Sequence, residues 1–180
     1  MNEISQILEA NEKIIWDGKP KYSAYMFSAI LGCLLVALFL ILFLGVITGA
    51  ILGVLAFAIL FSLANLSYKF IHYALTDKRA VLQSGIFGRS FKSVKYDEIK
   101  NASVSKGFFN WIFGTGNINI FTGEVTSTGG KNPRTVSKYD TFAYISDPYA
   151  VLKELQEHGT EMEENLYGGK NVVQRVQLVK

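Results

Sequence analysis

The sequence predicts an α+β protein in which a membrane α-helical hairpin is joined to one small, mainly-β domain. Three observations support this fold class. The stretch 22–68, 47 residues long, contains no Asp, Glu, Lys, Arg or His. The residues after it form short strand-like runs with a turn about every eight to ten residues. Asp147-Pro148 then marks the start of a closing helix, with Asp as N-cap and Pro at the first helical position.

The N-terminal region precedes the uncharged stretch. Residues 2–10 carry Ile4, Ile7 and Leu8 at helical spacing, which predicts a short amphipathic surface helix. Residues 13–16 are typical of a brief strand, and Asp-Gly-Lys-Pro at 17–20 predicts a turn. This turn would bring the chain to the bilayer.

The uncharged stretch is long enough for two membrane spans. A bilayer core about 30 Å thick needs roughly 20 residues of helix, and the stretch is about twice that length. We predict helices over about 25–44 and 48–67, with a turn at 45–49, where two glycines weaken the helix. A single long span with a re-entrant piece is the alternative. A signal peptide is excluded, because its apolar region is shorter and precedes a cleavage site.

Cations flank the predicted hairpin on one side only, which predicts its orientation. Lysines at 13, 19 and 21 precede it, cations at 69, 78 and 79 follow it, and the turn has none. Because cytoplasmic flanks carry the excess of Lys and Arg, we expect both termini to be cytoplasmic in a multi-pass protein of the cell membrane. The one cysteine lies inside the first helix and cannot form an intrachain disulfide, as expected in a reducing compartment.

Small residues recur at four-residue spacing within the predicted helices, a pattern that lets helices approach closely. They pack either the two helices of one hairpin or the hairpins of neighbouring molecules. These helices contain no ionisable residues, which ion and proton pathways normally show, so a transporter is disfavoured. The candidate packing residues are Ala29, Cys33, Ala37, Gly49 and Gly53.

Aromatic and β-branched runs predict the strands of the domain. They cover 70–75, 79–84, 90–96, 99–105, 117–122 and 135–145, with a flexible loop at 127–133. Antiparallel strands of this length form a small barrel or sandwich, closed by the helix that starts at 147–148. We expect Gly159 to stop that helix and residues 159–180 to form a flexible tail.

Several short motifs occur in order around the hairpin: NEKIIWDGKP at 11–20, YALTDKRA at 73–80, GIFGR at 85–89, VKYDEI at 94–99 and IFGTGNI at 112–118. Together they resemble the bacterial membrane-flanked family with pleckstrin-homology-like (PH-like) domains, bacterial PH domain type 2, over about residues 11–157. The resemblance implies a PH-like barrel of about seven antiparallel strands capped by a C-terminal helix, and no enzymatic activity. We divide the chain into 1–21, the hairpin 22–68, the PH-like domain 69–158 and the tail 159–180.

The sequence contains no pattern typical of a catalytic or metal site. His72 and His158 lack the spacing of zinc ligands. No nucleophile elbow or phosphate loop is found, and the adjacent Asp97 and Glu98 would face opposite sides of a strand. We therefore expect no enzyme, no cofactor, no metal and no nucleic-acid partner.

Two features are candidate contacts with the membrane surface or a partner. Residues 69–106 carry eight cations against three acidic residues, and near a bilayer each cation would be attracted by about 1 kcal/mol; alternatively they only fix the topology and solvate strands. An aromatic cluster between glycines contains Phe108, Phe109, Trp111, Ile112 and Phe113. It is either exposed, as an interfacial or partner site, or buried in the core. The candidate residues are Lys69, Lys78, Arg79, Arg89, Lys92, Lys95, Lys100, Phe108, Phe109 and Trp111.

The leading hypothesis is a membrane-anchored, non-enzymatic binding or scaffold module. It would present its PH-like domain at the cytoplasmic membrane surface to a protein partner or to lipid headgroups. The alternative is a membrane assembly component that acts through homo-oligomerisation of its hairpin.

Overall fold

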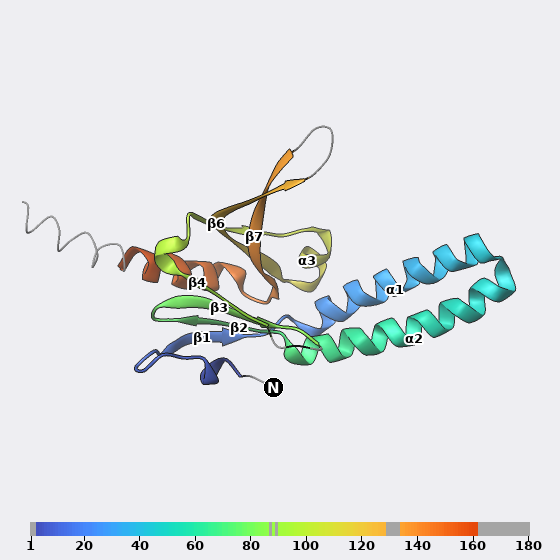
Figure 1. Cartoon of the computed structure of the whole chain (residues 1–180), viewed down its shortest axis with the longest axis horizontal. Helices are drawn as coiled ribbons and strands as arrows, with labels where there is room; N and C mark the ends of the chain where they lie inside the picture. Colours follow the sequence, from blue (N-terminus) through green and yellow to red (C-terminus); the bar gives the residue numbers. More distant parts are fainter. Residues whose placement is uncertain (1–2, 87, 89, 129–133, 162–180) are drawn as a thin grey trace, which may run out of the picture.

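The computed structural model describes residues 3–86, 88, 90–128 and 134–161. A long helical hairpin projects from one end of a β domain built of two sheets and a helix (Figure 1). The predicted loop at 127–133 and the tail after 161 lie largely outside the described residues, and Arg89 lies outside them as well.

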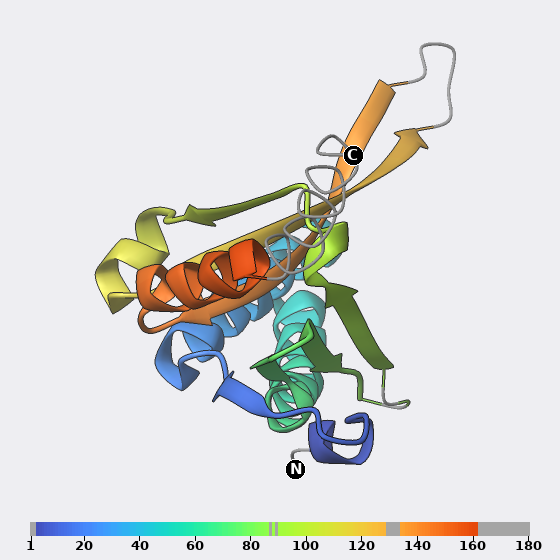
Figure 2. The same ribbon diagram turned by 90° about the vertical axis from the view of Figure 1, so that its left-hand side faces the viewer.

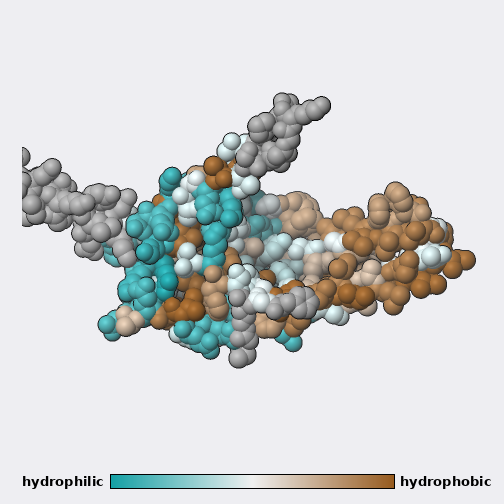
Figure 3. Space-filling view, in the orientation of Figure 1, coloured by the Kyte–Doolittle hydropathy of each residue, from teal (hydrophilic) through white to brown (hydrophobic). Residues whose placement is uncertain are grey.

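The hairpin consists of α1 (Tyr22–Leu44) and α2 (Val46–Phe70). Both are long and apolar enough to cross a membrane, and only 6% and 11% of their most apolar windows are buried inside the chain. They are therefore not core helices of the domain, and Figure 3 shows their hydrophobic surface. The predicted five-residue turn is wrong, because Gly45 alone reverses the chain, with a φ of 83° that favours glycine.

The first sheet combines residues from both sides of the hairpin. It contains β1 (Ile14–Gly18), β2 (His72–Thr76), β3 (Arg79–Ser84) and β4 (Ser90–Lys95), all antiparallel and in that order. In the register of β1 and β2, Gly18 lies opposite Tyr73. The strand before the hairpin and the strand after it are therefore neighbours in one sheet.

The second sheet contains β5 (Asn101–Ser105), β6 (Gly116–Thr128) and β7 (Arg134–Ile145), in the order β5-β6-β7. Seven antiparallel strands agree with the predicted number. Among the described residues, however, the strands form two separate hydrogen-bonded ladders, so the predicted closed barrel is not confirmed. Beyond an irregularity between Phe121 and Val125, the long strands β6 and β7 continue as a projecting arm (Figure 2).

The C-terminal helix starts at residue 148, as predicted, and the Asp147 side chain accepts a hydrogen bond from the Ala150 N–H (3.2 Å). It lies along the opening between the two sheets (Figure 2). The helix continues through Gly159 to residue 161, so the predicted stop at Gly159 is wrong. A lone glycine weakens a helix without necessarily ending it.

The core lies between the two sheets and the C-terminal helix. The Tyr73 and Phe142 rings, one from each sheet, stack with centroids 4.7 Å apart. This core cluster is completed by Leu75, Ala80, Val94, Tyr96, Ile118, Ile120, Ile145, Val151 and Leu155. Helix, first sheet and second sheet thus share one apolar core, as expected for a single folded domain.

A second, smaller apolar cluster covers the outer face of the first sheet. Ile4 is fully buried there against Ala74 and Val81. The predicted helix over 2–10 is wrong, since the segment forms only a short 3₁₀ turn, η1 (Ile4–Gln6). The packing of Ile4 against the sheet determines the conformation of this segment, because tertiary contacts override a weak local preference for helix.

Candidate functional site

The domain is attached directly to the base of the hairpin. The Lys21 N–H, just before α1, donates to the Tyr144 carbonyl in β7 (2.8 Å). Within α1, the Tyr25 ring meets the Tyr144 ring edge-on, with centroids 6.3 Å apart. On the other side, only Ile71 separates α2 from β2. With short covalent junctions and a hydrogen bond at the same level, the domain has little freedom to swing.

Tyrosines gather where the two helices meet the domain. Tyr22 and Tyr25 in α1 contact the ring of Tyr68 in α2, with centroids 5.0 and 5.6 Å apart. The Tyr22 hydroxyl also donates to the Asn65 side chain (3.2 Å). Tyrosine is enriched where membrane helices leave the hydrocarbon core, because its ring is apolar and its hydroxyl is polar.

The aromatic cluster after β5 forms a short helix, α3 (Phe108–Phe113), which packs beside α1. The rings of Phe109 and Phe113 lie 5.5 and 5.2 Å from the ring of Phe27, measured between centroids. The Lys21 Nζ donates to the Phe113 carbonyl (2.7 Å), which ties the end of α3 to the start of α1. Gly114 then ends α3 in the left-handed region, with a φ of 61°.

The side chains of α3 divide into an outer and an inner set. Phe108, Trp111 and Ile112 are 69%, 72% and 50% exposed. Asn110 instead is buried, and its side-chain oxygen accepts a hydrogen bond from the buried Thr115 hydroxyl (3.0 Å). The aromatic cluster is therefore an exposed surface helix with an apolar outer face.

The cationic candidates are spread along the domain. Strand β2 runs away from the hairpin, so the turn with Lys78 and Arg79 lies roughly 15 Å farther out. Lys95 lies at that same end, opposite Arg79 in the register of β3 and β4. At such a distance exposed charges are largely screened from a membrane surface, because the Debye length is about 8 Å. Lys69, in the last turn of α2, lies at the hairpin end.

Lys78, Arg79 and Lys92 contact acidic side chains. The ion pairs are Lys78–Glu9 (2.9 Å), Arg79–Glu12 (2.8 Å) and Lys92–Asp140 (2.7 Å). The Arg79 pair is the most buried, with the Glu12 side chain completely covered. For these residues a role as headgroup contacts stays a prediction, whereas their structural contacts are observed.

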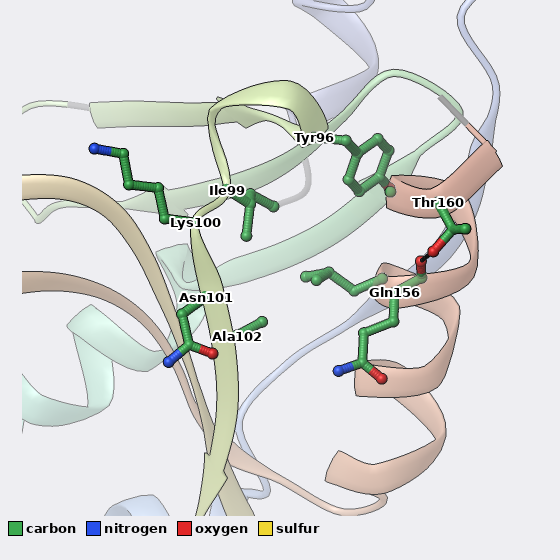
Figure 4. Close-up of a pocket in the computed structure, with 9 residues that line it drawn as sticks. Tyr96, Ile99, Lys100, Asn101, Ala102, Gln156 and Thr160 are labelled. Carbon is green, nitrogen blue, oxygen red and sulfur yellow. Dashed lines mark hydrogen bonds between the residues drawn. The ribbon is translucent and has the colours of Figure 1, made fainter. Parts of the chain in front are cut away.

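An open pocket of about 460 Å³ lies between the start of β5 and the C-terminal helix (Figure 4). Lys100, Asn101 and Gln156 are among its lining residues. The hydroxyl of Tyr96, also at the pocket, donates to the Thr76 carbonyl (2.6 Å). In the part of the chain that the structure describes, no group of three His, Cys, Asp or Glu side chains could hold a metal ion.

Phe27, Lys21 and Asn110 lie where α3 meets the start of α1 but are absent from the sequence candidates, whereas Ile112 belongs to the aromatic cluster that the sequence indicates. No local pattern indicates that Phe27 or Lys21 contacts a segment more than 80 residues later.

The fold and the site together define a class: a small domain of two antiparallel sheets and a helix, interrupted after its first strand by a long apolar hairpin. The family model of the bacterial PH domain matches residues 29–156, which include most of the hairpin. The chain belongs to the bacterial PH domain family, as its motifs predicted. No curated protein and no solved structure matches it.

Proposed function

We propose that the chain is a membrane-anchored, non-enzymatic module whose hairpin spans the bilayer twice. In this proposal the PH-like domain is held at the cytoplasmic membrane surface and presented to a protein partner or to lipid headgroups. PH-like domains are generally non-catalytic, and the described pocket residues include no acid–base or nucleophilic pair.

One observation carries this proposal: the two ends of the hairpin are built into the same domain. β1 enters the sheet before α1, and β2 continues it directly after α2. Both helix ends are therefore clamped at one face of the domain. A flexible tether would let the domain diffuse, whereas this junction favours a fixed orientation toward the surface from which the helices emerge.

The alternative, an assembly component that oligomerises through its hairpin, has less support. Gly49 faces the backbone of Ile41 and Leu40, and Gly53 faces Ala37, all within the same hairpin. Cys33 and the two glycines are buried there as well. The small residues thus already serve packing inside one molecule.

The topology can be tested by labelling single cysteines with a membrane-impermeant maleimide. A Cys33→Ala background carries either Ile47→Cys, in the 79% exposed end of the hairpin, or Ser103→Cys, on exposed β5. We expect only Ile47→Cys to react in right-side-out vesicles and only Ser103→Cys to react in inside-out vesicles. Labelling of both positions from the same side would contradict a hairpin that crosses the bilayer.

The binding function can be tested by affinity capture of the full chain from detergent, with copurifying proteins and lipids identified. A variant that lacks residues 69–158 but keeps the hairpin is the comparison. We expect this variant to lose the proteins and lipids that copurify specifically with the intact chain. If the hairpin alone retains them, the assembly alternative replaces the binding module.

A further inference from the structure

The outer face of α3 is an exposed apolar surface of the domain that the core does not use. Its three outward side chains are Phe108 and, one helical turn later, Trp111 and Ile112, and all are at least half exposed. Scattered single hydrophobic residues are normal on protein surfaces, but a group of large ones on one helix face indicates a contact.

The polarity of α3 is reversed relative to a helix on a soluble domain. Its polar residue, Asn110, is buried and accepts a hydrogen bond from the Thr115 hydroxyl, while the side that faces away from the domain is apolar. A surface helix facing water shows the opposite arrangement. This reversal is expected where the outer medium is itself apolar.

The position of α3 identifies that medium. Phe109 and Phe113 pack on Phe27, which lies five residues into α1 and so about 7 Å along the helix axis from Tyr22. The outer face of α3 is therefore continuous with the exposed apolar surface of the hairpin. It lies at the level of the tyrosines at the helix ends, where a bilayer changes from headgroups to acyl chains.

The charges around α3 suit an anionic lipid surface. Along the sequence, no acidic residue occurs between Glu98 and Glu124, whereas Lys106 lies two residues before the helix. The Lys106 Nζ lies 4.4 Å from the ring centroid of Tyr149, which is itself 60% exposed. Basic and amphipathic aromatic residues at the edge of an apolar face are typical of segments that lie in the membrane interface.

We propose that α3 is an interfacial anchor that inserts Phe108, Trp111 and Ile112 among the lipids beside α1. This inference rests on the proposed function, since it requires the hairpin to span a bilayer. With α1 and α2 it gives the domain three points of attachment. Three points fix the tilt and rotation of the domain, so the same face is always turned toward the cytoplasm.

Tryptophan fluorescence in vesicles of purified full-length protein tests this proposal. The vesicles contain phosphatidylcholine and phosphatidylglycerol brominated high on the acyl chains, and iodide serves as the aqueous quencher. Trp16→Phe leaves Trp111 as the sole tryptophan. We expect its emission to be blue-shifted, strongly quenched by the brominated lipid and largely insensitive to iodide.

Two matched single-tryptophan proteins, both carrying Trp16→Phe and Trp111→Phe, serve as controls. Val125→Trp places the probe at a 58% exposed position on the projecting arm and should respond to iodide only. Leu34→Trp places it at a 53% exposed position within α1 and should respond to brominated lipid. The second control reports hairpin insertion independently of α3.

If Trp111 responds to iodide as Val125→Trp does while Leu34→Trp is quenched by lipid, the anchor is refuted and the membrane hairpin stands. If Trp111 is shielded from both quenchers, a protein–protein contact covers α3 and the anchor is again refuted. If Leu34→Trp is not quenched by lipid, the proposed function itself fails.

Discussion

At the scale of single residues, Glu12 joins the segment before the hairpin to the strand after it. Its two carboxylate oxygens accept hydrogen bonds from Arg79 Nε (2.9 Å) and Nη2 (2.8 Å) in a bidentate arrangement, and the Thr76 hydroxyl donates a third (2.8 Å). The hydrogen bonds from Arg79 are the main reason why the pKa of Glu12 falls to about 2. The carboxylate is thus strongly favoured in its charged form.

Glu12→Gln should destabilise the domain, because it leaves the largely buried Arg79 guanidinium without a counter-charge. We expect a loss of about 2 to 4 kcal/mol in the free energy of unfolding, measured by denaturant titration of the full chain in detergent. Glu9→Gln is the matched control, since the Lys78–Glu9 pair is exposed on both sides. It should leave the midpoint unchanged; equal effects of the two substitutions would contradict a special role for Glu12.

His72, at the hairpin end of β2, should make stability depend on pH. It is 4% exposed, and burial, assisted by nearby Lys19, lowers its pKa from 6.5 to about 4. The folded state therefore resists protonation, while the unfolded chain takes up the proton. The stability contributed by neutral His72 is fully present above about pH 6.5 and is lost as the pH falls toward about 4.

We expect the wild-type chain to lose about 2 to 3 kcal/mol across that pH window, with the His72→Gln chain losing much less. The decisive measurements are unfolding titrations between neutral pH and about pH 5. Below that range Glu12 also contributes to the pH dependence of stability, because its ordinary pKa is 4.5. If the stability of both chains depends on pH in the same way, His72 is not the cause of the pH dependence.

At the scale of elements, the packing of α1 on α2 depends on Gly49. A Cβ at this position would lie 2.5 Å from the Ile41 Cα and from the Leu40 carbonyl oxygen, both backbone atoms that cannot rotate away. Gly49→Ala should therefore push the helices apart and cost about 1 to 3 kcal/mol. The measurement is thermal unfolding of the purified protein in detergent.

Gly32→Ala is the natural comparison, because a Cβ there meets nothing within 4 Å. We expect it to be neutral or slightly stabilising, as alanine favours a helix more than glycine does. If Gly49→Ala leaves the unfolding temperature unchanged but dissociates an oligomer, the small residues join copies of the chain instead of helices of one hairpin.

Elements with a long or repeated signal could be predicted from the sequence. The uncharged stretch gave both helices to within three residues at most of their ends, because charge is excluded from apolar helices along their full length. The short run before the hairpin and the six aromatic and β-branched runs after it predicted the number of strands. The C-terminal helix could be placed because Asp147 and Pro148 have distinct, local roles at a helix start.

Short elements and distant pairings could not be predicted in the same way. α3 has six residues, too few for a helical period to stand out, and its aromatic residues favour strands as readily. The outward face of α3 depends on where Phe27 lies, and Phe27 is in another element. The pairing of Gly18 with Tyr73 likewise joins residues separated by the whole hairpin, so no local pattern carries it.

At the scale of the whole molecule, the chain forms one domain that is continuous across the apolar hairpin. Its N-terminal segment contributes an edge strand, the Glu12 carboxylate and the Ile4 side chain to the first sheet. The contribution is not local, since β2, β3 and β4 all come after the hairpin. The segments before and after the hairpin should therefore unfold together.

Ile4→Ala tests this coupling, because Ile4 is fully buried against Ala74 in β2 and Val81 in β3. We expect a loss of about 2 to 4 kcal/mol and faster amide hydrogen exchange throughout β2, β3 and β4, more than 60 residues away in sequence. Ile14→Ala, at a 39% exposed position in β1, is the control and should change stability by about 0.5 kcal/mol or less. Faster exchange confined to residues 3–12 would instead mean that the N-terminal segment is an appendage, and that the sheet after the hairpin is stable without it.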